Sequence, residues 1–249
     1  MTPLQFLRHV LLTSSFIVSL AMTGCSTSDS SFGYSGSAKS LGHKPGPRGF
    51  RTVVLDAGHG GSDSGAVRNG IREKDVALDV VRRVEQKLGN AFRVKVVRNG
   101  DYFVDLDDRV NRASRSGDAV LVSVHFNSGP SSLSGVETYY WRVDSFGLAS
   151  RLHRAVGSVT PRDNNRGLVR RRLRLTRNPT IPCVLIECGY LSNRSEAALI
   201  RQASYRDRLA YAIAYAISAQ ASEGDGNIGP LPPPRWDPPS RGTDARDQW

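Results

Sequence analysis

The sequence predicts an α/β fold, with a mostly parallel central sheet sandwiched by helices in a single domain. Three observations support this prediction. Short apolar runs alternate along the chain with segments of helical period. Most of these runs are apolar throughout, as in strands that are buried on both faces. The chain of 249 residues, 39% hydrophobic and 23% charged, is long enough for one core with tails.

The elements follow one another in the order that such a fold requires. The first predicted strand, residues 52–56, is an apolar run that enters a glycine-rich loop at 57–61. A helix follows, since Val76, Val80 and Leu88 recur at helical spacing among charged residues. Further strands are expected at residues 94–97, 119–124, 135–141 and 183–186, and further helices at 108–115, 145–159 and 196–218.

The amino-terminal segment has the pattern of an export signal. Basic residues precede an apolar run at 10–22, which is shorter than the ~20 residues of a membrane-spanning helix. Small residues then lead to Cys25, which resembles a bacterial lipobox, although Met22 stands where leucine is usual. We therefore expect residues 1–24 to be a lipoprotein signal peptide and Cys25 to carry lipid. The alternative is an ordinary cleaved signal with an incidental cysteine.

The segments that flank the predicted domain have a different composition. Residues 25–48 are rich in Ser, Gly and Pro and are expected to form a flexible tether to the folded domain at 49–220. Residues 221–249 contain six prolines, which exclude a continuous helix or an inner strand. We expect this tail to be disordered. Ser26, rather than Asp, follows the lipid-bearing cysteine, which implies the periplasmic face of the outer membrane if the cell is diderm.

The charge balance favours an anionic partner. Lys and Arg number 34 against 23 Asp and Glu, which gives a net charge of +11. Because the chain is expected to be exported, nucleic acid is excluded as that partner. Ten arginines and no lysine lie between residues 142 and 177. This arginine-rich stretch is either a solvated basic face or a surface that grips carboxylates by bidentate contacts.

Residues suited to metal binding and proton transfer follow three of the predicted strands. His59 follows the first strand, His125 the third, and Glu187 the strand at 183–186, while Glu73 begins the first helix. Sites in α/β sheets assemble beyond the carboxyl ends of the strands, so these side chains are expected to meet. Two imidazoles and one carboxylate form a common catalytic zinc set, and a further carboxylate can move a proton. Asp56 and Asp63 flank His59 and could orient its imidazole or cap the loop.

The sequence motifs around these residues resemble those of one known family. Five blocks occur in order: Val53-Val-Leu-Asp-Ala-Gly-His-Gly-Gly-Ser-Asp-Ser-Gly-Ala66, Glu73-Lys-Asp75, Ser123-Val-His-Phe-Asn127, Gly135-Val-Glu-Thr-Tyr-Tyr140 and Leu185-Ile-Glu-Cys-Gly-Tyr-Leu-Ser-Asn193. Together they resemble the zinc-dependent N-acetylmuramoyl-L-alanine amidases of the Amidase_3 family, over about residues 52–218. Phe126 departs from the family, which usually has a small residue there.

The resemblance implies a role for each of these residues. His59, Glu73 and His125 would bind one Zn²⁺, and Glu187 would be the catalytic carboxylate of an Amidase_3-like domain. The implied reaction is hydrolysis of the amide between the lactyl group of N-acetylmuramic acid and L-alanine. Two alternatives stay open: a zinc peptidase that cuts within the stem peptide, and a non-catalytic peptidoglycan-binding lipoprotein.

The remaining expectations concern substrate contacts and partners. We predict that Asn127, Arg166 and Arg174 bind substrate, because they lie in or beside the motif blocks. Peptidoglycan is the expected partner, with the membrane reached through the lipid on Cys25, and the chain is expected to be a monomer. Only 61 residues separate His125 from Glu187, too few for an added inhibitory helix. We therefore expect no inhibitory insert over the site. An activator protein of unknown identity stays an open alternative as a partner.

Overall fold

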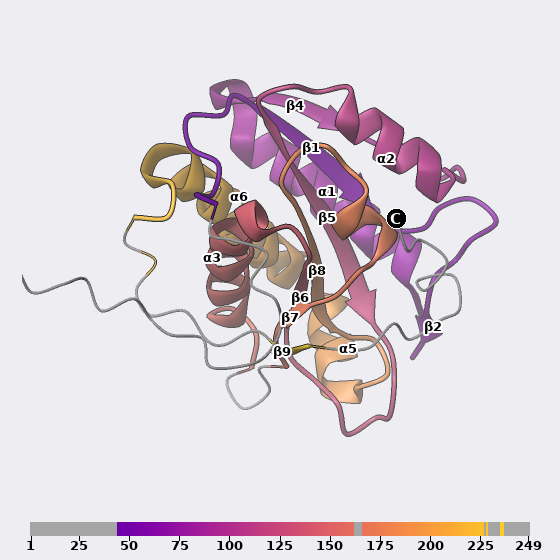
Figure 1. The fold of residues 1–249 in the computed structure, drawn as a ribbon. Helices are drawn as coiled ribbons and strands as arrows, with labels where there is room; N and C mark the ends of the chain where they lie inside the picture. The colour runs from indigo at the N-terminus through magenta and orange to yellow at the C-terminus, as the bar shows by residue number, and fades with distance from the viewer. Residues whose placement is uncertain (1–43, 162–165, 227, 229–234, 237–249) are drawn as a thin grey trace, which may run out of the picture. The chain divides into compact units, whose positions relative to one another are not determined.

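The core of the fold is a seven-stranded sheet with the strand order β4-β1-β5-β8-β6-β7-β9 (Figure 1). The computed structural model describes residues 44–161, 166–226, 228 and 235–236. The strands are β1 (Thr52–Ala57), β4 (Arg93–Val96), β5 (Ala119–Asn127), β6 (Glu137–Tyr140), β7 (Gly167–Arg170), β8 (Cys183–Tyr190) and β9 (Arg235–Trp236). A separate two-stranded hairpin joins β2 (Val67–Arg68) to β3 (Ile71–Arg72).

The direction of the strands brings distant parts of the chain to one edge. β4, β1, β5 and β8 are parallel, so their carboxyl ends share an edge. β6 is antiparallel to β8, and β7 is parallel to β6, so both of these strands begin at that same edge. We call it the site edge. The antiparallel direction of β6 places Glu137 directly opposite Glu187.

Helices cover both faces of the sheet, as Figure 1 shows. The helices are α1 (Glu73–Leu88), α2 (Leu106–Ser114), α3 (Phe146–Gly157), α4 (Arg174–Arg177), α5 (Arg194–Ile200) and α6 (Ala203–Glu223), with short 3₁₀ turns at Gly89–Ala91 and Val143–Ser145. The larger core lies under α1, α3 and α6, whose apolar residues pack against the sheet. A smaller core lies under α2 and α4 on the other face.

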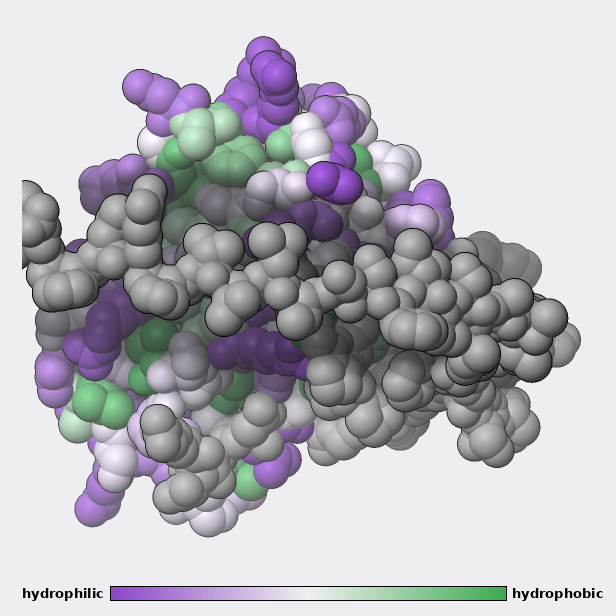
Figure 2. Space-filling view, turned by 90° about the vertical axis from the view of Figure 1, so that its left-hand side faces the viewer, coloured by the Kyte–Doolittle hydropathy of each residue, from purple (hydrophilic) through white to green (hydrophobic). Residues whose placement is uncertain are grey.

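Burial divides the helix surfaces as their periodicity predicts. On α1, Val76, Val80, Val84 and Leu88 are buried, whereas Arg82 is exposed. Figure 2 shows the side of the molecule that carries α3 and α6 in Figure 1, where hydrophilic side chains surround smaller hydrophobic areas on the visible surface. No helix in the part of the chain that the structure describes has the length and apolar character needed to cross a membrane.

The predicted fold class is confirmed, and the structure adds details at the carboxyl-terminal side. α6 continues to Glu223, and Arg235–Trp236 pair with β7 as an edge strand within the segment that was expected to be a tail. An edge position is the one that the prolines of this segment allow. The predicted signal peptide and Cys25 lie outside the described residues, so the limits of those segments stay predictions.

Candidate active site

The loop after β1 presents His59 at the site edge in a constrained backbone conformation. His59 has a positive φ of 60°, which is uncommon for a residue other than glycine. Such conformations persist where the surroundings determine them, and they occur often at functional sites. The His59 carbonyl accepts a hydrogen bond of 2.7 Å from Arg109. The bond from Arg109 therefore fixes the backbone of this loop, and the imidazole of His59 lies at the site edge.

His59, Glu73 and His125 come together as one group of metal-donor atoms. Glu73 Oε1 lies 3.0 Å from His59 Nε2 and 2.8 Å from His125 Nδ1. One donor atom from each residue falls within 4.8 Å of the others, and the two rings meet edge to face at 4.9 Å. The side chains of His59 and His125 are 23% and 17% exposed, so solvent reaches the group. The three residues could hold a metal ion.

Two glycines leave the room that this group needs. A Cβ on Gly58 would lie 2.3 Å from the His125 ring. A Cβ on Gly65, which has a positive φ, would lie 2.5 Å from the His59 ring and 2.6 Å from Glu73 Oε2. Any larger residue would push the donor side chains aside. The glycines of the first motif therefore fit a compact metal-donor group, beyond shaping the turn.

Hydrogen bonds orient the donors and set their charge. Asp63 Oδ2 lies 2.7 Å from His59 Nδ1, and Asp63 Oδ1 accepts a 3.0 Å hydrogen bond from the Gly65 nitrogen, so this residue both orients the imidazole and caps the loop. Asp56 does neither, because its carboxylate is bound by Arg109 and Ser123. Burial lowers the pKa of His59, but the carboxylates of Glu73 and Asp63 outweigh it and leave that pKa raised. Burial raises the pKa of Glu73, and bonding to His125 and His59 reverses this and holds it well below its usual range. Glu73 is thus an anionic donor.

Two buried arginines hold the His59 loop against the sheet, and neither was identified from the sequence. Arg98, 1% exposed, donates to the carbonyls of Ala57, Gly58, Lys74 and Gly100. Arg109 donates to Asp56 Oδ1 at 2.6 Å, and Ser123 donates to the other oxygen of that carboxylate at 2.6 Å. The position of Arg98 two residues after β4 was the available hint, but arginines at such positions are usually solvated.

Replacing Arg109 by methionine should destabilise the fold by about 3–5 kcal/mol, because Asp56 would keep its buried charge without a cationic partner. Asp56 is fully buried, so water cannot replace the guanidinium. Urea denaturation of both variants measures the change, with the exposed Arg115→Met, at the carboxyl-terminal cap of the same helix, as control. Equal stability of the two variants would show that the Asp56–Arg109 pair does not support the loop.

Glu187 places a second carboxylate beside the donor group. It lies on β8 directly opposite His125 of β5 and Glu137 of β6. Its Oε2 is enclosed and has no hydrogen-bond partner among the described residues. Burial raises the pKa of Glu187 well above its usual range, and the charges of Glu73 and Glu137 raise it further. A half-buried carboxylate with one oxygen that has no partner among the described residues, next to metal donors, is suited to proton transfer.

Two of the three predicted substrate-binding residues join a polar cluster at the start of β6 and β7. Glu137 Oε2 accepts hydrogen bonds from Asn127 Nδ2 at 3.1 Å and from Tyr190 Oη at 3.2 Å. Arg166 hydrogen-bonds Tyr190, which lowers the pKa of that phenol, but burial and Glu137 dominate and raise it to about 12. The sequence analysis identified the motif at residues 135–140 but did not single out Glu137 as a site residue. The signal that could have identified it is a carboxylate inside a strand.

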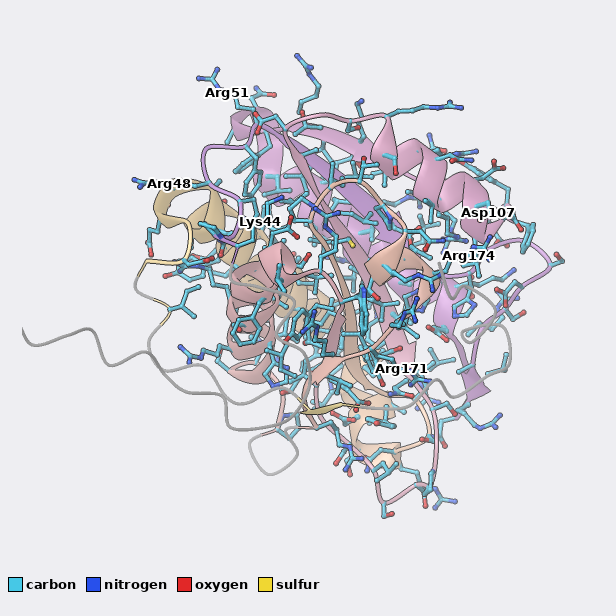
Figure 3. All side chains as sticks on the ribbon, in the orientation of Figure 1. Lys44, Arg48, Arg51, Asp107, Arg171 and Arg174 are labelled. Carbon is cyan, nitrogen blue, oxygen red and sulfur yellow. The ribbon has the colours of Figure 1, made fainter. Side chains whose placement is uncertain are left out.

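The third predicted residue lies elsewhere. Arg174 pairs with Asp107 at the first turn of α2, with its Nε 2.7 Å from Asp107 Oδ1 (Figure 3). Other arginines of the arginine-rich stretch stack on aromatic rings: Arg170 and Arg172 lie 5.1 and 5.2 Å from the Trp141 ring. Several arginines of the arginine-rich stretch therefore contact other side chains of the fold, so the stretch does not form one uniform solvated face.

Comparison with known proteins agrees with this site. The family model described as N-acetylmuramoyl-L-alanine amidase matches residues 53–219. N-acetylmuramoyl-L-alanine amidase LytC of Bacillus subtilis is 35% identical over 65% of this chain, which spans only 34% of that relative's length. The catalytic domain of the amidase CwlV from Bacillus (Paenibacillus) polymyxa superposes with a TM-score of 0.64 and 36% identity, covering 68% of this chain and 96% of that one.

A further solved structure is the CwlD amidase from Clostridioides difficile in complex with the GerS lipoprotein. It has a TM-score of 0.64 and 30% identity, and covers 68% of this chain and 96% of that one. The family model covers the whole sheet from β1 to β8 and all four residues that the resemblance singled out. This chain belongs to the N-acetylmuramoyl-L-alanine amidase family.

Proposed function

We propose that this protein hydrolyses, in peptidoglycan, the amide that joins the lactyl group of N-acetylmuramic acid to L-alanine of the stem peptide. One observation carries the proposal: the donor group of His59, Glu73 and His125 lies beside the enclosed carboxylate of Glu187. Family membership adds the substrate class.

We propose Zn²⁺, one ion per chain, as the metal that His59, Glu73 and His125 hold. Two imidazoles and one carboxylate suit this ion, and the glycine cradle gives the group its compact form. Bound zinc would polarise the lactyl carbonyl and make hydroxide available near neutral pH. Asp63 holds the imidazole of His59 in position through the 2.7 Å contact.

Glu187 supplies the proton transfers in this proposal. Its carboxylate takes the proton that the attacking water loses as the new C–O bond forms. It then delivers that proton to the amine nitrogen of L-alanine while the C–N bond breaks. The raised pKa of Glu187 suits the second step, because the group holds a proton more readily than an exposed glutamate does.

Removing the metal should abolish release of stem peptides from purified peptidoglycan, and added zinc should restore it. The assay compares the enzyme before chelation, after chelation and after zinc addition, and follows the appearance of L-alanine amino groups. Equal activity after complete removal of metal, checked by elemental analysis, would overturn the zinc assignment. Internal amino groups of the stem would instead favour the peptidase alternative, and binding to the wall without any product would favour the non-catalytic one.

Asn127 and Arg166 are the proposed contacts to the stem peptide. Asn127, at the end of β5, hydrogen-bonds Glu137, and Arg166, just before β7, hydrogen-bonds Tyr190, which itself donates to Glu137. A guanidinium there can pair with a carboxylate of the stem, since bidentate pairing suits that geometry. Arg174, which was predicted with them, stays a weaker candidate because it is paired with Asp107.

We further propose that the protein is exported and anchored through lipid on Cys25, with residues 25–48 as tether. In a diderm cell the anchor would lie on the periplasmic face of the outer membrane. Cys25→Ser should move the protein from the membrane fraction to the soluble fraction, measured by cell fractionation and by incorporation of labelled fatty acid. Retention of label in Cys25→Ser would contradict this site of lipidation.

The purified protein should be active without a second protein. Among the described residues between His125 and Glu187, the helices are the turn at Val143–Ser145, α3 and α4. α3 packs in the larger core with α1 and α6, and neither α3 nor α4 contributes a residue to the donor group. Measured turnover should therefore not depend on added cell extract. Inactivity that extract relieves would show that an activator is needed, as the complex of CwlD with GerS makes worth testing.

A further inference from the structure

The loop between β4 and α2, residues 97–105, carries exposed aromatic side chains beside the metal-donor group. Tyr102 is 42% exposed and Phe103 55% exposed, and Leu106 follows at 50%. Only three other large hydrophobic residues in the described part of the chain are exposed to a similar degree, namely Val67, Tyr211 and Tyr215. Exposed apolar side chains gathered in one short segment are typical of binding surfaces. We call residues 97–105 the aromatic loop.

The aromatic loop is fixed directly to the loop that carries His59. A Cβ on Gly60 would lie 2.3 Å from the Tyr102 carbonyl oxygen, and one on Gly61 would lie 2.5 Å from the Phe103 nitrogen. Only glycines allow this backbone contact. Since His59 immediately precedes both glycines, the aromatic pair lies at the rim of the donor group and is not a distant surface feature.

Polar contacts hold the same loop rigidly. Asp101 accepts a 2.8 Å hydrogen bond from the Gly61 nitrogen and another of 2.8 Å from Lys74 Nζ, which also donates to the Gly61 carbonyl. The Tyr102 hydroxyl lies 3.3 Å from both the nitrogen and Oδ1 of Asn99. The backbone of the aromatic loop and the Tyr102 ring are thus held in place, which reduces the entropy lost when a ligand binds.

The aromatic loop and Arg166 lie at opposite ends of the site edge. In the strand order, the aromatic loop follows β4, His59 follows β1, His125 lies on β5, Glu187 on β8 and Arg166 just before β7. With neighbouring strands ~4.8 Å apart, β1 and β7 are separated by about 19 Å. A substrate that crosses the donor group can therefore contact the aromatic loop at one end and Arg166 at the other.

The two ends differ in charge as the two halves of the proposed substrate do. The exposed charged residues of the aromatic loop and the first turn of α2 are all acidic, namely Asp101, Asp105, Asp107 and Asp108, whereas Arg98 and Arg109 are buried. Asp101 is paired with Lys74 and Asp107 with Arg174, so Asp105 and Asp108 contribute most of the negative charge on this side. Stem peptides carry free carboxylates, which Asp105 and Asp108 repel and which Arg166 attracts. The sugar rings carry no such charge, and their C–H faces can pack on aromatic rings as other apolar surfaces do.

We propose that Tyr102 and Phe103 form a stacking platform for the glycan strand of peptidoglycan, which sets the direction in which substrate crosses the site. The proposal rests on the proposed function, because the scissile amide must have a sugar on one side and a peptide on the other. The glycan lies toward β4 and the stem peptide toward β7. The platform accounts for the exposure of both rings and for their rigid attachment to the His59 loop.

Glycan binding by full-length protein in a Glu187→Gln background tests this platform without hydrolysis. The probe is purified glycan chains from which stem peptides have been removed. Tyr102→Ala combined with Phe103→Ala should weaken glycan binding about tenfold, as the loss of two ring contacts implies. Tyr102→Phe combined with Phe103→Tyr should retain it. Zinc content and thermal unfolding of each variant verify that the site and the fold are intact.

The matched control removes two equally exposed tyrosines at a distance. Tyr211 and Tyr215 on α6 are 65% and 63% exposed, and their replacement by alanine should leave glycan binding unchanged. Unchanged binding in the Tyr102/Phe103 variant, or an equal loss in the α6 control, would overturn the platform. Release of stem peptides by the otherwise unaltered protein is measured separately. If the otherwise unaltered protein releases stem peptides but the Tyr102/Phe103 variant binds glycan as before, the platform alone is overturned. If the Tyr102/Phe103 variant loses glycan binding but the otherwise unaltered protein releases no stem peptides, only the proposed reaction is overturned.

Discussion

Replacing Glu187 by glutamine should lower kcat on peptidoglycan by about a thousandfold while the zinc content stays at one ion per chain. Glutamine keeps the size of the side chain but cannot accept the proton of the attacking water. Its neutral amide also relieves the repulsion that Glu187 experiences from Glu73 and Glu137, so the fold should be at least as stable as before. The expected signature is therefore lost turnover in a stable protein that retains its metal.

Turnover, zinc content and thermal unfolding of Glu187→Gln provide the three readouts. Glu85→Gln on α1 is the matched control, since it makes the same chemical change on a helix surface away from the donor group. Wild-type turnover by Glu187→Gln would show that another group moves the proton. Loss of zinc together with activity would instead mean that Glu187 contributes to metal binding.

Replacing His125 by alanine should remove the bound zinc and with it all turnover. His125 is one of three donors, and the remaining pair, His59 and Glu73, cannot complete the set that this ion requires. The loss also leaves Glu73 with one fewer hydrogen bond on Oε1. Elemental analysis after dialysis gives the zinc content, which should fall from one ion per chain to near zero.

His153→Gln is the control for this change. His153 is also buried and hydrogen-bonds Thr138 at 3.0 Å, but it lies on α3 and outside the donor group. It should keep its zinc even if its stability falls. Equal zinc content in His125→Ala and wild type would remove His125 from the ligand set, and the proposed site with it.

The elements and the main site could be predicted because their signals are local. Unbroken apolar runs such as 119–124 mark buried strands, and the glycines around His59 mark a loop that ends a strand. Parallel strands then bring their carboxyl ends to one edge, whatever the length of chain between them. For this reason His59, His125 and Glu187 could be expected to meet before the structure placed them together.

The sequence pattern was weaker where structure depends on contacts between distant residues. β7 is a four-residue strand within the arginine-rich stretch, so its apolar signal is only Leu168 and Val169. Nothing in the apolar pattern of β6 encodes that it runs antiparallel to β8, yet that direction brings Glu137 opposite Glu187. Burial of Arg98 depends on three carbonyls from distant parts of the chain, those of Ala57, Gly58 and Lys74, which no local pattern contains.

The most direct test of the central claim is where isotopically heavy oxygen from water enters the products of peptidoglycan digestion. Full-length protein, loaded with zinc, is incubated with purified peptidoglycan in heavy-oxygen water, and the products are analysed by mass spectrometry. The proposed hydrolysis predicts label in the lactyl carboxylate of muramic acid and unlabelled stem peptides that begin with a free L-alanine amine. Label within the peptides, with L-alanine still attached to muramic acid, would contradict it.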